Sequence, residues 1–164
     1  MSPRDVRAEL VALLPRLRRF ARSLARDAHD ADDLLQLALE RALTRLGQLR
    51  PEAQLAAWMY GILRHAWIDE VRARGRRARL LTGAQAGEQV SDASQGAPAE
   101  ALAVQDALAR LPEEQRSAVA LVLIEGLSYK EAAYVMEVPI GTLTSRLARA
   151  REALQALLGE SGTS

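Results

Sequence analysis

The sequence predicts an all-α protein made of two small helical domains joined by a flexible linker. Three observations support this prediction. Ala, Leu and Arg, which favour helices, dominate, whereas aromatic residues make up only 4% of the chain and β-branched residues are scarce. Apolar residues recur at three- and four-residue steps over most of the length. Residues 80–99 lose this periodicity and are rich in Gly, Ala, Ser and Gln, as is typical of a linker.

The composition excludes several classes of protein. With 164 residues, 49% hydrophobic and 26% charged, the chain is long enough for one or two domains and is not disordered. A formal net charge of +1 excludes a uniformly basic packaging protein, so any contact with nucleic acid requires local clustering of charge. The absence of cysteine excludes disulfides, thiol catalysis and zinc sites with Cys ligands.

The sequence also lacks the features expected of an enzyme or a membrane protein. It contains no nucleophile–base constellation, no glycine-rich phosphate loop and no plausible metal cluster, so we expect neither a cofactor nor a metal. The N-terminus is charged, and no apolar run approaches the ~20 residues that cross a bilayer. The sequence therefore predicts a cytoplasmic protein without membrane insertion.

The first domain, residues 1–79, is expected to begin with two helices. Leucines at helical spacing predict the first helix over about residues 4–26, which Pro15 should kink or restart. Asp30 resembles the N-cap of the second helix, and Gly47 resembles its C-terminal stop.

A third helix is predicted over about residues 53–77. Its middle, residues 58–71, is apolar on nearly every side, which is typical of a helix that neighbours enclose or that presents apolar groups to a partner. Its end is strongly basic and is expected to attract phosphates, although a solvated helix end would have the same composition. The basic residues are Arg72, Arg74, Arg76, Arg77 and Arg79.

The second domain, residues 100–158, is expected to contain a helix-turn-helix. Ser128 and Glu131 form a capping box before one short helix, and residues 137–139 form a tight turn before the next. The predicted helices of this domain cover about residues 99–110, 112–126, 129–136 and 140–158.

The last helix is amphipathic in a way that suits the major groove of DNA. At 100° per residue, Leu143, Leu147 and Ala150 share an inward side, whereas small and polar residues point outward. Arg146 lies near the edge of the core and is expected to reach either a phosphate or an acidic neighbour. The alternative is a plain helical hairpin with solvated arginines. The residues able to hydrogen-bond base edges or phosphates are Thr142, Thr144, Ser145 and Arg149.

Several segments resemble those of extracytoplasmic-function (ECF) sigma factors. In the second domain, the similarity to the promoter-binding domain is carried by residues 107–116, 125–133 and 139–151. In the first domain, residues 30–36 resemble the polymerase-binding helix, and residues 57–65 and 68–72 resemble the helix for the promoter element nearer the start site. Two sets of motifs in the family's order make the resemblance specific.

The resemblance implies a two-domain factor without enzymatic activity that binds bacterial RNA polymerase core, directs it to a promoter and helps to open the duplex. An anti-sigma factor holds many relatives inactive, so one is expected here. The polymerase contacts implied by the resemblance are Asp33, Leu34 and Gln36. The contacts with the upstream promoter element would come from Thr142, Thr144, Ser145, Arg146, Ala148 and Arg149.

Opening DNA requires side chains that stack on unpaired bases, at about 1–3 kcal/mol per base. Tyr60, Arg64 and Trp67 share one face of the third helix at steps of four and three residues, with Trp58 opposite as a core residue. The alternative for Trp67 is packing on the first helix. The full set expected to meet the melted strand and its backbone is Tyr60, Arg64, His65, Trp67, Arg72, Arg74, Arg76 and Arg77.

Some positions depart from the family pattern. His65 stands where the family often has the asparagine associated with the captured base, so the base preference stays open, as does simple packing of the histidine between helices. Leu37 and Leu39 replace the usual Glu and Phe, and exposed leucines on their helix would suit a protein partner. Thr144 and Ala148 are shorter than the usual residues, which leaves a sigma-like adaptor or decoy as the alternative function.

Overall fold

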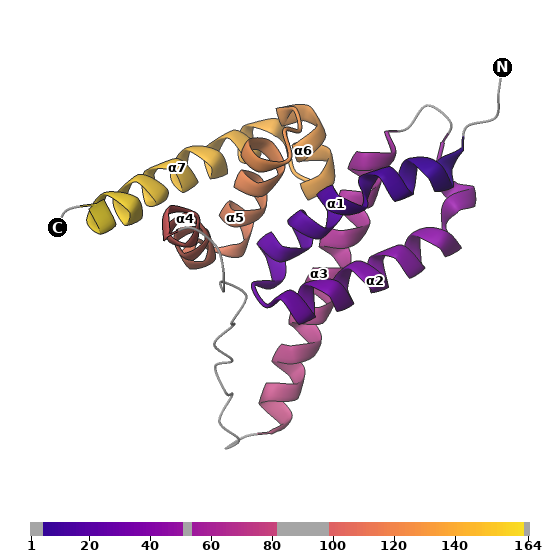
Figure 1. Cartoon of the computed structure of the whole chain (residues 1–164), viewed down its shortest axis with the longest axis horizontal. Helices are drawn as coiled ribbons and strands as arrows, with labels where there is room; N and C mark the ends of the chain where they lie inside the picture. Colours follow the sequence, from indigo (N-terminus) through magenta and orange to yellow (C-terminus); the bar gives the residue numbers. More distant parts are fainter. Residues whose placement is uncertain (1–4, 51–53, 82–98, 163–164) are drawn as a thin grey trace.

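The computed structural model describes residues 5–50, 54–81 and 99–162, and confirms the all-α prediction (Figure 1). The described residues contain no strand. Most of the predicted linker, residues 82–98, lies outside the described residues, so its character stays a prediction. The elements are α1 Val6–Ala25, α2 Ala28–Thr44, η1 Leu46–Gln48, α3 Leu55–Leu80, α4 Ala99–Arg110, α5 Glu113–Val119, η2 Ala120–Ile124, α6 Tyr129–Met136 and α7 Ile140–Gly162.

Two boundaries in the first domain differ from the prediction. The N-cap of α2 is Asp27, whose carboxylate accepts from the His29 backbone N–H at 3.0 Å, so Asp30 lies in the first turn instead. Arg26 has a positive φ of 49°, which turns the chain just before Asp27. Helix α2 therefore begins before the predicted N-cap, Asp30. At the other end, α2 ends at Thr44, before the predicted stop at Gly47, which lies in the short 3₁₀ turn η1. Helix α1 continues through Pro15 as one element.

Helices α1, α2 and α3 pack against one another around a core rich in leucine. Phe20 of α1 and Tyr60 of α3 meet edge-to-face, with ring centroids 5.2 Å apart and an interplanar angle of 89°. Both rings are completely buried. The same interior holds Leu17, Leu24, Met59 and Leu63.

The second domain follows the prediction closely. The capping box at the start of α6 is confirmed, because the Glu131 N–H donates to Ser128 Oγ and the Ser128 N–H donates to Glu131 Oε1, both at 3.0 Å. The turn between α6 and α7 begins at Glu137, whose φ of 57° ends α6 in a left-handed conformation. This turn orients α7 against α5 and α6.

The segment between α5 and α6 contains a π turn that the sequence analysis did not predict. Over η2 the backbone hydrogen bonds widen, and the Glu125 N–H donates to the Ala120 carbonyl at 2.8 Å. Gly126 follows with a φ of 74°, a conformation that a residue with a Cβ rarely adopts. The π turn and Gly126 end this helical stretch. The Glu125 side chain then points toward the first domain, where it contacts Arg19 and Tyr60.

The two domains lie directly against one another, with α3 packed on α6 and α1 packed on α5 (Figure 1). The C-terminal end of α3 projects away from the other helices. Among the described residues, no helix is long and apolar enough to span a bilayer.

Candidate nucleic-acid and partner interfaces

Helix α7 presents the predicted polar face to solvent. Leu143, Leu147 and Ala150 are buried, as their helical spacing predicts. Gly141, Thr144, Ser145, Ala148, Arg149 and Glu152 are exposed, and Thr142 is half-buried. The hydroxyl of Thr144 donates to the Ile140 carbonyl at 2.9 Å, so it is already engaged within the helix. The side chains of Ser145 and Arg149 are exposed and have no hydrogen bond to the described part of the chain.

Arg146 contacts an acidic neighbour, one of the two alternatives that its position allows. Its guanidinium lies 3.5 Å from the Glu114 carboxylate, and its side chain is only 20% exposed. The ion pair links α7 to α5. In this structure Arg146 therefore supports the position of the helix rather than projecting toward DNA.

The structure contradicts the predicted faces of α3. Tyr60 is fully buried, and Arg64 and Trp67 are only 8% and 9% exposed. Trp58, predicted as a core residue, is half-buried: it packs against the core and also lines an open groove. The periodicity failed because the middle of α3 is apolar on nearly every side, so the sequence alone does not distinguish its faces. Capture of unpaired bases by Tyr60, Arg64 and Trp67 stays a prediction, and requires an arrangement that uncovers them.

The basic end of α3 contains arginines that form ion pairs and arginines that form none among the described residues. Arg74 lies 3.0 Å from both Glu70 and Asp30, and Arg77 lies 3.2 Å from Glu70. Burial opposes the charge of Arg74, but the hydrogen bonds to Glu70 and Asp30 outweigh it and raise the pKa of this guanidinium. Within the described part of the chain, Arg72 and Arg76 are exposed and form no ion pair.

His65 is exposed, contrary to the alternative that it packs between helices. Its side chain is 48% accessible, and Nε2 lies 3.2 Å from the Glu137 carboxylate at the end of α6. Beside it, α3, α6 and the turn into α7 enclose an open groove of about 690 Å³. The groove is lined mainly by apolar groups, including Trp58, Ile62 and Tyr134.

The predicted polymerase surface on α2 is partly exposed. Asp33 and Gln36 are accessible, whereas Leu34 is only 5% exposed and belongs to the core, contrary to the prediction. Leu34 is buried because α2 turns this side toward its neighbours in the bundle. Leu37 and Leu39 are half-buried, and Leu43 near the end of α2 is 52% exposed.

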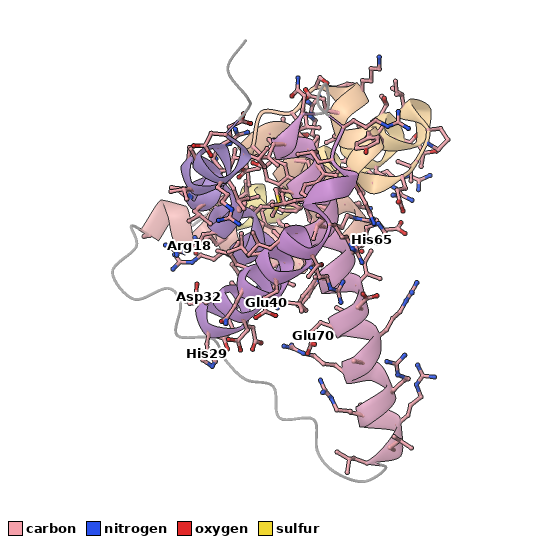
Figure 2. All side chains as sticks on the ribbon, turned by 90° about the vertical axis from the view of Figure 1, so that its right-hand side faces the viewer. Arg18, His29, Asp32, Glu40, His65 and Glu70 are labelled. Carbon is pink, nitrogen blue, oxygen red and sulfur yellow. The ribbon has the colours of Figure 1, made fainter. Side chains whose placement is uncertain are left out.

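Charged side chains cover the outer side of this region (Figure 2). Arg18 of α1 lies 3.8 Å from Asp32, and His29 lies 3.8 Å from Asp33. No three His, Asp or Glu side chains among the described residues converge as a metal site would require.

Glu125 forms a buried cluster between the domains that sequence analysis missed. Its carboxylate accepts two hydrogen bonds from Arg19, at 2.7 and 3.0 Å, and one from the Tyr60 hydroxyl at 2.7 Å. Arg16 lies 3.9 Å from the same carboxylate and donates to the Glu125 backbone carbonyl at 3.3 Å. The partners are separated by 65 to 109 residues in the chain, so no local motif indicates them. We call Glu125, Arg16, Arg19 and Tyr60 the Glu125 cluster.

Comparison with known proteins gives matches for both domains. Residues 10–77 match the family described as Sigma-70 region 2, and residues 101–154 match Sigma-70, region 4. The ECF RNA polymerase sigma factor EcfG of Rhodopseudomonas palustris is 39% identical over 94% of this chain and 85% of its own length. The ECF RNA polymerase sigma factor SigM of Mycobacterium tuberculosis is 40% identical over 87% of this chain and 71% of its own length.

Solved structures show the same relationship. The sigma factor RpoE of Bartonella quintana, in complex with the anti-sigma factor NepR, is 34% identical with a TM-score of 0.85, covering 94% of this chain and 97% of that one. CnrH, in complex with the cytosolic domain of CnrY, is 29% identical with a TM-score of 0.70, covering 93% and 87%. The resemblance of the sequence motifs is thus confirmed, and this chain belongs to the ECF sigma factors of the sigma-70 family.

Proposed function

We propose that this protein directs bacterial RNA polymerase core to promoters and initiates transcription, acting in the cytoplasm as a binding factor without chemistry of its own. The observation that carries the proposal is the exposed polar face of α7, in a chain similar to ECF sigma factors over both domains. In this function α7 enters the major groove at the upstream element, where Arg149 and Ser145 reach base edges or phosphates.

The first domain would hold the polymerase and the opened strand. Asp33 and Gln36 are accessible for a protein contact, and Leu34 would support their helix from within. Arg72 and Arg76 are available for backbone phosphates, at the projecting end of α3. The proposed capture of unpaired bases by Tyr60, Arg64, His65 and Trp67 follows separation of the two domains.

Control by an anti-sigma factor is part of the proposal. In two similar solved structures, RpoE is bound to the anti-sigma factor NepR, and CnrH is bound to the cytosolic domain of CnrY. The described groove between α3 and α6 is apolar and borders both domains of this chain, so a helical segment seated there would contact the two together.

Run-off transcription tests the proposed function. Purified protein and core polymerase would be incubated with genomic promoter fragments, and the transcript starts would be mapped. We expect discrete starts that depend on the protein and that weaken in Arg149→Ala. Complex formation with another protein, without binding to core and without any transcript, would instead identify a sigma-like decoy.

A further inference from the structure

Helix α1 carries a run of positive charge that the proposed function leaves unexplained. Residues 10–26 contain five arginines and neither Asp nor Glu, although the net charge of the whole chain is only +1. Three of these arginines are exposed and follow one another at four-residue steps: Arg18, Arg22 and the C-cap residue Arg26. Side chains at this spacing share one face of a helix, so the three form a continuous stripe on the surface. We call these three residues the α1 basic stripe.

Acidic neighbours compensate little of this charge. Arg18 has one ion pair, with Asp32 of α2, at the long distance of 3.8 Å and between two largely exposed side chains (Figure 2). Such a pair contributes little to stability. Among the described residues Arg22 forms no ion pair. The negative end of the helix dipole favours cations only in the last turn of a helix, so it does not account for Arg18.

The second domain adds a further positive charge beside the Arg26 end of the stripe. Arg116 of α5 is only 9% exposed, and its Nε has no hydrogen-bond partner among the described residues. Burial lowers the pKa of this guanidinium, the carboxylate of Glu113 opposes the change, and the charge of Arg26 adds to it. Arg26 and Arg116 are therefore close enough to repel each other, and an anion bound at the stripe would reduce that repulsion.

The surroundings of the stripe favour a nucleic acid over a protein as the bound polyanion. Protein interfaces usually bury large apolar or aromatic anchors, but residues 12–26, all of them described, expose no large apolar side chain. Contacts with a DNA backbone need only cations and hydrogen-bond donors. Arginine suits such contacts, because its fork binds two phosphate oxygens at once and it always stays charged.

We propose that the α1 basic stripe binds the phosphate backbone of DNA without regard to sequence, as a contact additional to those of α7 and of the basic end of α3. The choice of DNA as the polyanion rests on the proposed function, whereas the uncompensated charge of the stripe does not depend on it. The stripe would add affinity and salt dependence at every promoter alike, and sequence specificity would stay with α7.

The salt dependence of DNA binding by the free, full-length protein tests this contact. A fluorescent duplex of random sequence and one of its strands alone are each titrated with the protein, and the affinity is measured by anisotropy at several salt concentrations. Arg22→Ala should reduce the slope of log K against log salt by about 0.9 on duplex or about 0.7 on single-stranded DNA. Arg18→Ala should reduce it by a similar amount, and the double variant by about twice as much. Arg22→Lys, which keeps the charge, should retain the wild-type slope.

A matched control separates the stripe from a general loss of positive charge. Arg45 is also exposed, but it follows the last residue of α2, about 25 Å along that helix from the end next to the stripe. Arg45→Ala should therefore keep the wild-type slope, and circular dichroism would establish that each variant remains helical. Equal losses in Arg45→Ala and Arg22→Ala would overturn the proposal, and so would wild-type slopes in both folded variants, Arg18→Ala and Arg22→Ala.

Polyglutamate, titrated in the same way, distinguishes an acidic protein partner. If Arg22→Ala weakens binding to polyglutamate and leaves both DNA slopes unchanged, the stripe binds protein and the proposal is wrong. A wild-type protein that binds neither DNA at low salt also overturns it. Run-off transcription is read separately: if no transcript forms but the slopes fall as expected, the proposed function fails while the DNA contact of the stripe stands.

Discussion

The guanidinium of Arg74 lies over the ring of Trp67, 5.8 Å from its centroid. The same guanidinium contacts Glu70 one turn earlier on α3 and Asp30 on α2. One side chain thus covers a nearly buried tryptophan and links two helices, although the sequence indicates only phosphate contact or a solvated helix end for this run of arginines. The structure therefore assigns different roles to neighbouring arginines.

Arg74→Ala should destabilise the protein by about 1–2 kcal/mol, because it removes a cation–π contact and two partly shielded ion pairs. Urea unfolding followed by circular dichroism measures this change. Arg76→Ala, two residues further along the same helix, is the matched control, and its free energy of unfolding should lie within about 0.5 kcal/mol of wild type. Equal stabilities for the two variants would contradict the assigned role of Arg74.

Arg76→Ala should weaken the binding of the polymerase complex to promoter DNA, because its side chain is exposed for a phosphate contact. Each lost phosphate contact lowers the slope of log K against log salt by about 1. Titrations over a range of salt concentrations measure that slope. A slope identical to that of wild type would remove Arg76 from the phosphate contacts.

Arg149→Ala should reduce promoter affinity by about tenfold or more, since a lost base contact costs roughly 1–3 kcal/mol. The loss should depend on the upstream sequence and should leave core binding intact. Arg151→Ala, also exposed but turned from the outward face of α7, serves as the control. Equal losses in both variants would indicate nonspecific electrostatics instead of recognition by Arg149.

Asp33→Arg should weaken binding to core polymerase by about tenfold without unfolding the chain, because Asp33 is exposed on α2 and its only described ion pair is the long contact with His29. Pull-down or fluorescence titration with core measures the affinity. Asp106→Arg on α4, where the ion pair is with Arg110, is the charge-matched control. Wild-type affinity in Asp33→Arg would remove this residue from the interface.

Tyr60→Phe should change how stability depends on alkaline pH. Burial, and then the hydrogen bond to Glu125, raise the pKa of Tyr60 above its ordinary value of 10.0, so the folded protein retains a proton that the unfolded chain releases. The stabilisation is complete below pH 10.0 and is lost as pH rises above it, by up to about 1.4 kcal/mol per pH unit. Urea unfolding of wild type and Tyr60→Phe across this range should show a steeper decline for wild type. If the free energy of unfolding fell equally with pH in both proteins, the raised pKa of the buried Tyr60 hydroxyl would be contradicted.

Local patterns in the sequence predicted most of the helices. Ser128 and Glu131 form a capping box within four residues, so the start of α6 was determined by local chemistry. The buried stripe of α7 followed equally well from spacing. Asp27 and Asp30 were harder to distinguish, because both are good N-caps and the choice depends on the backbone turn at Arg26.

The candidate site was less predictable because it depends on packing between distant segments. Helical spacing placed Tyr60, Arg64 and Trp67 on one face, but it did not indicate that this face would be covered. Tyr60 packs on Phe20 of α1, and its hydroxyl bonds to Glu125, which lies 65 residues away and follows a π turn without a recognisable local sequence. The four-residue spacing from Glu70 favours an ion pair for Arg74 and not for Arg76, but only the packing of α2 on α3 adds the contact with Asp30.

The π turn at η2 holds one residue more than the same stretch of ordinary α-helix would need. Loss of a single residue there would let the stretch close as ordinary α-helix, with the Glu125 N–H still bonded to the Ala120 carbonyl over the usual four-residue step. The residues before and after the turn would keep their relative orientation, so Glu125 would still face α1. A relative one residue shorter at this point could thus preserve the same contact, although a comparison of the two sequences would show a gap beside it.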